Sequence, residues 1–117
     1  MYVKDYQEVP SEPGGVDGLT VRWVINASQG ASNFAMRVFE LESGKLSPFH
    51  QHDHEHEVFV IGGIGEVETS QGAAPIKAGS VIFIAKNESH QFRNNGTEIL
   101  SFIDGIAFST LRKQQNI

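Results

Sequence analysis

The sequence predicts an all-β fold, built as an antiparallel sandwich or barrel, from three observations. Roughly eight short segments alternate between apolar and polar residues or run apolar, and turn residues bound them. Glycines stand in nearly every connection, and no segment carries a long apolar period of 3.6 residues. A chain of 117 residues, 39% hydrophobic and 20% charged, suits one core, so we expect a single domain without internal repeats.

The first predicted element is an N-terminal arm over residues 1–18, where prolines and glycines interrupt any apolar period. The barrel itself is expected over residues 19–108, with strands at 20–26, 34–42, 58–61, 66–69, 81–85, 90–93 and 99–103. A C-terminal tail over residues 109–117 is expected to form a short helix or to fray.

Two of these strands and one connection carry more specific expectations. Residues 58–61 and 81–85 are continuously apolar, which is typical of strands buried on both faces. Residues 94–97 contain an Asn-Gly pair, which is preferred in type I′ hairpin turns.

Charge and composition exclude several functions. The net charge of −5 argues against a general nucleic-acid-binding surface, which needs an excess of lysine and arginine. The absence of cysteine excludes disulfides and cysteine zinc sites. No apolar run is long enough to span a membrane, and the first residues do not resemble a secretory leader. We therefore expect a cytoplasmic protein that binds neither nucleic acid nor membrane.

The histidines indicate a metal site. His50, His52, His54 and His56 lie in one short stretch, and His90 stands alone beyond it. Imidazole nitrogens suit Zn, Cu, Fe and Ni, and the chain has no thiolate that would select otherwise. Several imidazoles from one stretch and another from a distant strand can together build such a site. The alternative is a solvated loop rich in histidine and acidic residues.

The histidines also fall in two spaced motifs. The first runs Gly44, five residues, His50, one residue, His52, three residues, His56, six residues, Gly63. The second runs Gly79, five residues, Ala85, one residue, Asn87, two residues, His90, three residues, Asn94. Together they resemble the paired motifs of the cupin superfamily, in particular its small single-domain conserved-barrel members. The resemblance spans about residues 18–104 and implies an antiparallel double-stranded β-helix, the jelly-roll barrel of cupins.

The sequence departs from the family pattern at three positions. Ala85 replaces a proline, and Asn87 replaces a turn glycine, although asparagine tolerates a left-handed backbone. The family glutamate position is occupied by His56, whereas a spacing one residue longer selects Glu57. Because neighbouring strand residues point to opposite faces, only one of the two can face inward. The six-residue step to Gly63 favours His56.

The resemblance implies one divalent transition metal, Mn, Fe, Ni, Zn or Cu, bound by His50, His52, His56 and His90, with Glu57 as the alternative to His56. His54 is expected at the rim. Arg37 is a candidate for binding a substrate carboxylate, with an inter-strand arginine as the alternative. Phe92 is expected to share the face of His90 and to wall the pocket.

Two classes of function remain open. The first is a small metalloenzyme that acts on a small anionic metabolite, such as a carboxylate or enol, as a dioxygenase, isomerase, decarboxylase or lyase. The second is a non-catalytic barrel that binds or senses a metal or small ligand. We also expect a homodimer, with an unanchored N-terminal arm and with Val21, Trp23 and Ile25 as an exposed apolar strand edge.

Overall fold

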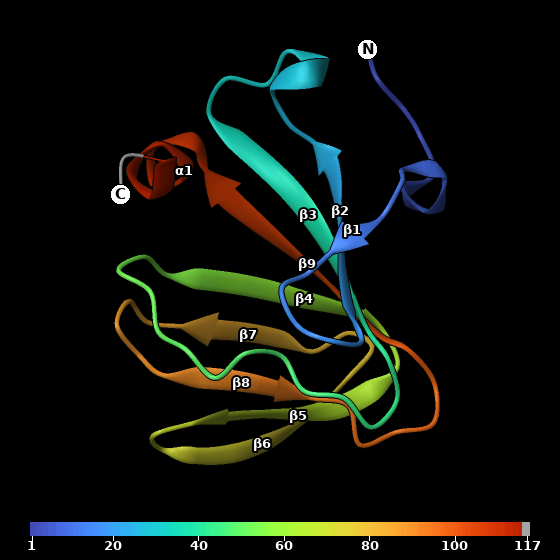
Figure 1. The fold of residues 1–117 in the computed structure, drawn as a ribbon, viewed down its shortest axis with the longest axis vertical. Helices are drawn as coiled ribbons and strands as arrows, with labels where there is room; N and C mark the ends of the chain where they lie inside the picture. The colour runs from blue at the N-terminus through green and yellow to red at the C-terminus, as the bar shows by residue number, and fades with distance from the viewer. Residues whose placement is uncertain (116–117) are drawn as a thin grey trace.

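The chain folds into two antiparallel sheets that form a jelly-roll barrel (Figure 1). The computed structural model describes residues 1–115. The six-stranded sheet has the order β1-β2-β3-β9-β4-β7, and the three-stranded sheet has the order β6-β5-β8. The strands are β1 Glu12–Pro13, β2 Leu19–Ile25, β3 Phe34–Leu41, β4 His56–Gly62, β5 Ile64–Thr69, β6 Gly72–Lys77, β7 Val81–Ile84, β8 His90–Arg93 and β9 Leu100–Ala107. The all-β prediction is confirmed.

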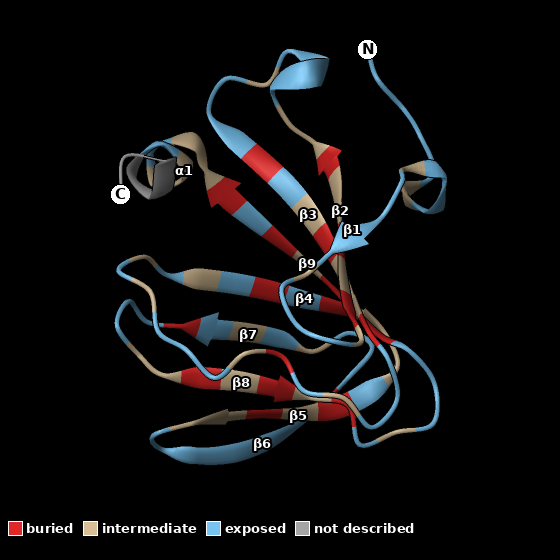
Figure 2. Ribbon diagram, viewed as in Figure 1, coloured by how far each residue is buried: buried red, intermediate tan, exposed pale blue. Residues whose placement is uncertain are grey.

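The core lies between the two sheets because each strand alternates its side chains. Leu41, Val60 and Leu100 are fully buried, and Ile84 and Phe92 are 1% and 4% exposed. Burial of this kind contributes most of the free energy of folding, at about 25 cal/mol per Å² of apolar surface. Figure 2 shows buried residues along β3, β9 and β4. The inward residues of these strands form the inner face of the barrel.

Two strands that we expected to be buried on both faces are buried on one face only. In β4, Val58 and Val60 face the core, while Phe59 is 48% exposed. In β7, Ile84 is buried, while Val81 and Phe83 are 77% and 62% exposed. The prediction was wrong because a continuous apolar run does not show what covers its second face. Here nothing within the described chain covers the outer side of β4 and β7.

The N-terminal arm is anchored, contrary to expectation. Residues 12–13 pair with β2 as strand β1, and Tyr2 donates a hydrogen bond to the carbonyl oxygen of Val24. Arg22 donates to the carbonyl oxygens of Gln7 and Val9 around the short 3-10 helix Tyr6–Glu8. The strand edge at Val21 is therefore partly covered, and Val21 is 8% exposed.

The segment after β8 crosses between the sheets and is not a type I′ hairpin. Such a turn needs positive φ at both central residues, and neither Asn95 nor Gly96 has it. Instead the buried side chain of Asn94 donates to the carbonyl oxygens of Leu41 and Glu98, both at 2.8 Å, and accepts from Gly96 N at 2.9 Å. The side-chain amide of Asn94 thereby supplies the hydrogen bonds that hold this turn.

The remaining elements complete the barrel. Strand β6 was not predicted, and it pairs along its whole length with β5. The 3-10 helix Ala27–Gln29 lies between β2 and β3, and the chain continues from β9 into helix α1, Phe108–Gln115. The last two residues of the expected C-terminal tail lie outside the described residues. Within residues 1–115, no helix is long and apolar enough to cross a membrane.

Candidate metal centre

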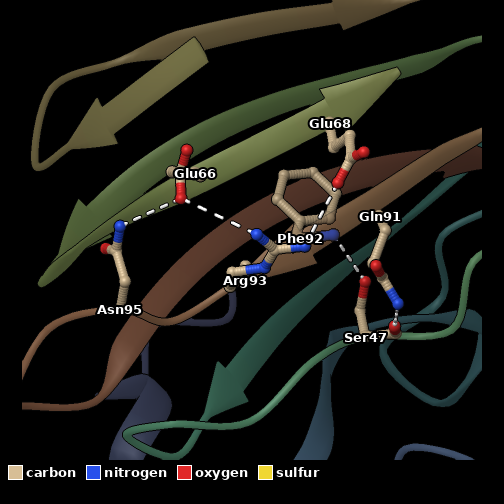
Figure 3. Close-up of polar contacts among 7 residues, drawn as sticks. All are labelled: Ser47, Glu66, Glu68, Gln91, Phe92, Arg93 and Asn95. Carbon is tan, nitrogen blue, oxygen red and sulfur yellow. Dashed lines mark hydrogen bonds and ion pairs between the residues drawn. The ribbon is translucent and has the colours of Figure 1, made fainter. Parts of the chain in front are cut away.

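The histidine-rich segment lies along strand β8, where main-chain contacts hold it in place. His50 N donates to the carbonyl oxygen of His90 at 3.2 Å, and His90 N donates back to that of His50 at 2.9 Å. Three residues earlier, Ser47 Oγ accepts from Phe92 N at 2.7 Å, and Gln91 Nε2 donates to the carbonyl oxygen of Ser47 at 2.9 Å (Figure 3). The two motifs are thus joined side by side.

Turn geometry holds the segment on its other side. Asn87 has a φ of 64°, the left-handed conformation expected from its place in the second motif. Its main-chain N–H donates to the carbonyl oxygen of His52, and Glu88 Oε1 accepts from Ala85 N at 3.1 Å. This turn, in which Asn87 stands at the family glycine position, therefore positions His52 of the first motif.

Strand alternation separates His56 from Glu57. His56 begins β4, pairs with Ile84 and points into the barrel, where its side chain is 13% exposed. Glu57 pairs with Phe83 on the outer face and is exposed. Glu57 contacts a different cavity and lies in neither of the possible metal-binding groups among the described residues. Only His56 of the pair faces the cluster.

All five histidines form one cluster centred on His52. Its ring centroid lies 4.1 Å from His50, 4.7 Å from His54, 4.8 Å from His56 and 5.2 Å from His90. Two sets of three have their ligand nitrogens within 4.8 Å of one another: His50, His52, His90 and His52, His54, His56. The structure brings together the four expected histidines and adds His54, which we had placed at the rim.

The donor atoms of this cluster fit a divalent metal. Nδ1 of His54 and Nε2 of His56 are buried without a hydrogen-bond partner among the described residues, which is costly unless an ion or water engages them. His90 Nδ1 lies 3.0 Å from the carbonyl oxygen of Glu88, which leaves Nε2 free to coordinate. Metal–nitrogen bonds of about 2.0–2.1 Å separate two ligand nitrogens by at most about 4.2 Å, and each set of three already has its nitrogens within 4.8 Å of one another.

The electrostatics of the cluster favour the neutral form of His50, His52, His54 and His56, which is the form that coordination requires. Burial, followed by the neighbouring His52, lowers the pKa of His56 to about 3. Burial and then the neighbouring His50 lower the pKa of His52 to about 4. The pKa values of His50 and His54 are also lowered, mainly by burial.

The cluster opens into a cavity of about 190 Å³. Phe39, Phe92 and Phe102 stack along one wall, and the ring of Phe92 lies 6.3 Å from that of His90. Phe92, on β8 like His90, therefore lies where the sequence placed it. A small cavity of this kind suits a small molecule, because drug-sized ligands occupy about 300–1,000 Å³.

Arg37 also lines the cavity, but its guanidinium group is already paired. Its Nε and Nη2 donate to the two carboxylate oxygens of Asp104, at 2.9 and 2.6 Å, across the register of β3 and β9. Arg37 also lies over the rings of Trp23 and Phe39. The structure therefore matches the inter-strand alternative, because the Nε–Nη2 side of the guanidinium group is occupied by Asp104.

Asp104 is a residue of the site that the sequence analysis missed. Its side chain is 3% exposed, and one oxygen lies 3.6 Å from Nδ1 of His56. We expected the last strand to end at residue 103, whereas β9 continues to Ala107. The available signal was alternation, because Asp104 continues the inward positions of Leu100 and Phe102.

A small jelly-roll barrel with a histidine cluster on its inner face defines the class of cupin-like barrels. The profile of the family described as "Cupin domain" matches residues 37–106, and the chain belongs to this family. No curated protein matches the chain.

Solved structures extend the likeness to the whole barrel. The polyketide cyclase RemF from Streptomyces resistomycificus is 27% identical with a TM-score of 0.83, covering 92% of this chain and 79% of its own. A cupin 2 domain-containing protein from Halorhodospira halophila is 27% identical with a TM-score of 0.72, covering 80% and 69%. A predicted oxalate decarboxylase from Thermotoga maritima is 24% identical with a TM-score of 0.77, covering 91% and 98%. The last likeness shows the fold alone.

Proposed function

We propose that this cupin binds one divalent transition metal through His50, His52, His56 and His90 and acts as a metalloenzyme on a small anionic metabolite. The observation that carries the proposal is the convergence of these imidazoles on His52, with Nε2 of His56 buried and unpartnered among the described residues. A solvated loop would leave such a nitrogen in water. Mn, Fe, Ni, Zn and Cu are the metals that we consider.

Charge favours an anion as the guest. Four neutral imidazoles leave the double positive charge of the ion uncompensated, and the Arg37–Asp104 pair beside them adds no net charge. Phenylalanine rings line the cavity, and the low dielectric there strengthens attraction between opposite charges. The net charge of −5 opposes capture only at long range, because salt screens exposed charges beyond about 10 Å.

The reaction type depends on the chemistry of the site, because the fold alone does not select one. A bound metal supplies a Lewis acid that polarises a carbonyl or carboxylate oxygen, or a bound water of lowered pKa. The chain supplies the apolar wall of Phe92 and Phe102 and a cavity of about 190 Å³. The 27% identity with the polyketide cyclase RemF supports an enzyme, and dioxygenase, isomerase and decarboxylase reactions remain in the proposal.

A non-catalytic metal or ligand binder is the alternative, and one observation favours it. Among the described residues that line the cavity, the titratable groups are the clustered histidines and the paired Arg37 and Asp104. Apart from the four proposed ligands and this ion pair, only His54 among these residues could act as a general acid or base, and no carboxylate is free for that role. Catalysis would then depend on the metal, its bound water and His54, whereas a binder needs no such group.

The test begins with protein purified without a nickel column and analysed for metal. The expected content approaches one ion per chain and is largely lost in His90→Ala. Oxalate, pyruvate and an enol acid are then added to metal-loaded and metal-free protein while the melting temperature is followed. A shift only in the loaded protein supports the anion site, whereas equal shifts place the anion elsewhere. Turnover of any of these compounds would favour the enzyme over the binder.

A further inference from the structure

Asp104 is a buried carboxylate between an arginine and a histidine. Asp104 lies on the inner face of β9, paired with Arg37 of β3 on one side and Val58 of β4 on the other. Arg37 uses one lone pair on each carboxylate oxygen. Each oxygen of a carboxylate accepts about two hydrogen bonds, so Oδ2 can still accept another.

His56 presents its two nitrogens to different surroundings. Nδ1 lies 3.6 Å from Asp104 Oδ2, slightly longer than a hydrogen bond. Nε2 is buried without a partner among the described residues. The rings of His52 and His90 lie 4.8 and 5.1 Å from that of His56.

A neutral imidazole carries one proton, and the surroundings decide which nitrogen holds it. A proton on Nδ1 meets the negative oxygen of Asp104 and leaves the lone pair of Nε2 available. A proton on Nε2 would turn the lone pair of Nδ1 toward the same negative oxygen, and would block Nε2 as a ligand. The charge of Asp104 and the need for a free Nε2 lone pair therefore both favour the tautomer with its proton on Nδ1.

We propose that Asp104 is the positioning residue of the metal centre: it holds His56 as the Nδ1-protonated tautomer and directs Nε2 toward the ion. Arg37, which lies over the rings of Trp23 and Phe39, in turn fixes the carboxylate from the other side. Carboxylate partners of this kind orient ligating histidines and raise their basicity. The part of the proposal that concerns metal affinity rests on the proposed function, and the part that concerns the tautomer does not.

The chain offers a matched control for a merely structural role. Arg22 and Glu40 form a second inter-strand arginine–carboxylate pair in the same sheet, at 2.7 Å, with both side chains less than one-fifth exposed. Their side chains project from the face opposite that of Arg37 and Asp104, since Arg22 pairs with Val38 and Trp23 with Arg37. Glu40→Gln therefore removes a comparable carboxylate without touching the histidines.

The first test needs no variant. Long-range nitrogen–proton NMR of the metal-free wild-type protein at pH 7.5 assigns the tautomer of His56. The expected result is a proton on Nδ1 and an unprotonated Nε2. A proton on Nε2 would overturn the proposal, whether or not the protein binds metal.

The second test compares Asp104→Asn with Glu40→Gln. Asp104→Asn is expected to shift His56 toward the other tautomer and to weaken Zn²⁺ binding, measured against a competing chelator, by about 10- to 100-fold. Glu40→Gln is expected to change neither, even if it lowers the melting temperature as much. Equal effects in both variants, or none in Asp104→Asn, would reduce Asp104 to a structural role. Wild-type protein that binds no Zn²⁺ would refute the proposed function. The NMR experiment would then still decide which nitrogen of His56 carries the proton.

Discussion

His50 and His90, 40 positions apart in the chain, exchange main-chain hydrogen bonds of 3.2 and 2.9 Å. This reciprocal pair brings the first histidine of one motif beside the histidine of the other. The ring centroids of the two residues lie 5.0 Å apart as a result. The backbone of the barrel, more than any contact between side chains, therefore assembles the centre.

The first prediction concerns His52, which belongs to both groups of three histidines. His52→Ala should abolish metal binding, because either set would lose a member. His90→Ala should remove most of the metal if the proposed four-histidine set is correct, while His54→Ala should cost little. The measurement is metal content per chain after dialysis. Loss of metal in His54→Ala with retention in both His50→Ala and His90→Ala would select the other set.

The second prediction separates His56 from its neighbour. His56→Gln should weaken Zn²⁺ binding by at least about tenfold, because it removes an inward nitrogen ligand. Glu57→Gln should leave affinity unchanged, since Glu57 is exposed on the outer face of β4. Competition with a chelator measures both constants. Metal lost in Glu57→Gln but kept in His56→Gln would reverse the assignment.

The third prediction is a pH dependence of stability. Folding lowers the pKa of His52 to about 4 and that of His56 to about 3. An imidazole in the unfolded chain has a pKa of about 6.5. At pH values between about 6.5 and these lowered pKa values, the unfolded chain therefore binds protons that the folded chain does not. The metal-free protein should therefore lose stability as pH falls from about 6.5 toward 3, with no contribution from these groups above that window.

Chemical denaturation of metal-free protein at several pH values measures this effect. A variant carrying His52→Gln and His56→Gln should show a flatter profile than the wild type, because it lacks the two groups. The lowered pKa values should also let the wild type keep its metal to a lower pH than unperturbed imidazoles would. An identical pH profile in the variant would contradict the assignment of the effect to these histidines.

The fourth prediction concerns the buried Asn94. Asn94→Ala removes hydrogen bonds to the carbonyl oxygens of Leu41 and Glu98 and from Gly96 N. Leaving buried partners unsatisfied costs about 1–3 kcal/mol each, so a loss of at least about 2 kcal/mol in the free energy of unfolding is expected. Asn95→Ala, which removes one exposed contact to Glu66, should cost less than about 1 kcal/mol. Urea denaturation checks both, and equal losses would contradict the role of Asn94.

The fifth prediction is a homodimer, formed through the outer face of β4 and β7. Phe59, Val81 and Phe83 expose apolar side chains there, with Phe59 directly paired to Val81. Phe83→Glu should convert the dimer to a monomer in sedimentation at micromolar concentration. Ile64→Glu, at an equally exposed apolar position on the other sheet, should leave the dimer intact. A wild-type monomer at this concentration would refute the prediction.

Local patterns in the sequence determined most of the strands and the choice of candidate ligands, although strands β1 and β6 were not predicted. Alternation along 34–42 and the glycine-rich connections predicted strands because side-chain direction repeats every two residues. The spacing of His50, His52 and His56 and the isolation of His90 indicated one site on a barrel. The alternation and the spacing of the clustered histidines each lie within about ten residues of chain, a range over which residue order alone constrains the backbone.

The tertiary structure decided what these local patterns left open. Whether the apolar runs of β4 and β7 are covered depends on the opposing surface, and Phe83 is exposed because nothing within the described chain packs over it. His54 joins the cluster with its ring stacked on that of His52, at 4.7 Å between centroids. Asp104 meets Arg37 and His56 only through the pairing of β9 with β3 and β4. These contacts join residues up to 67 positions apart, and strand register, which no local pattern records, sets them.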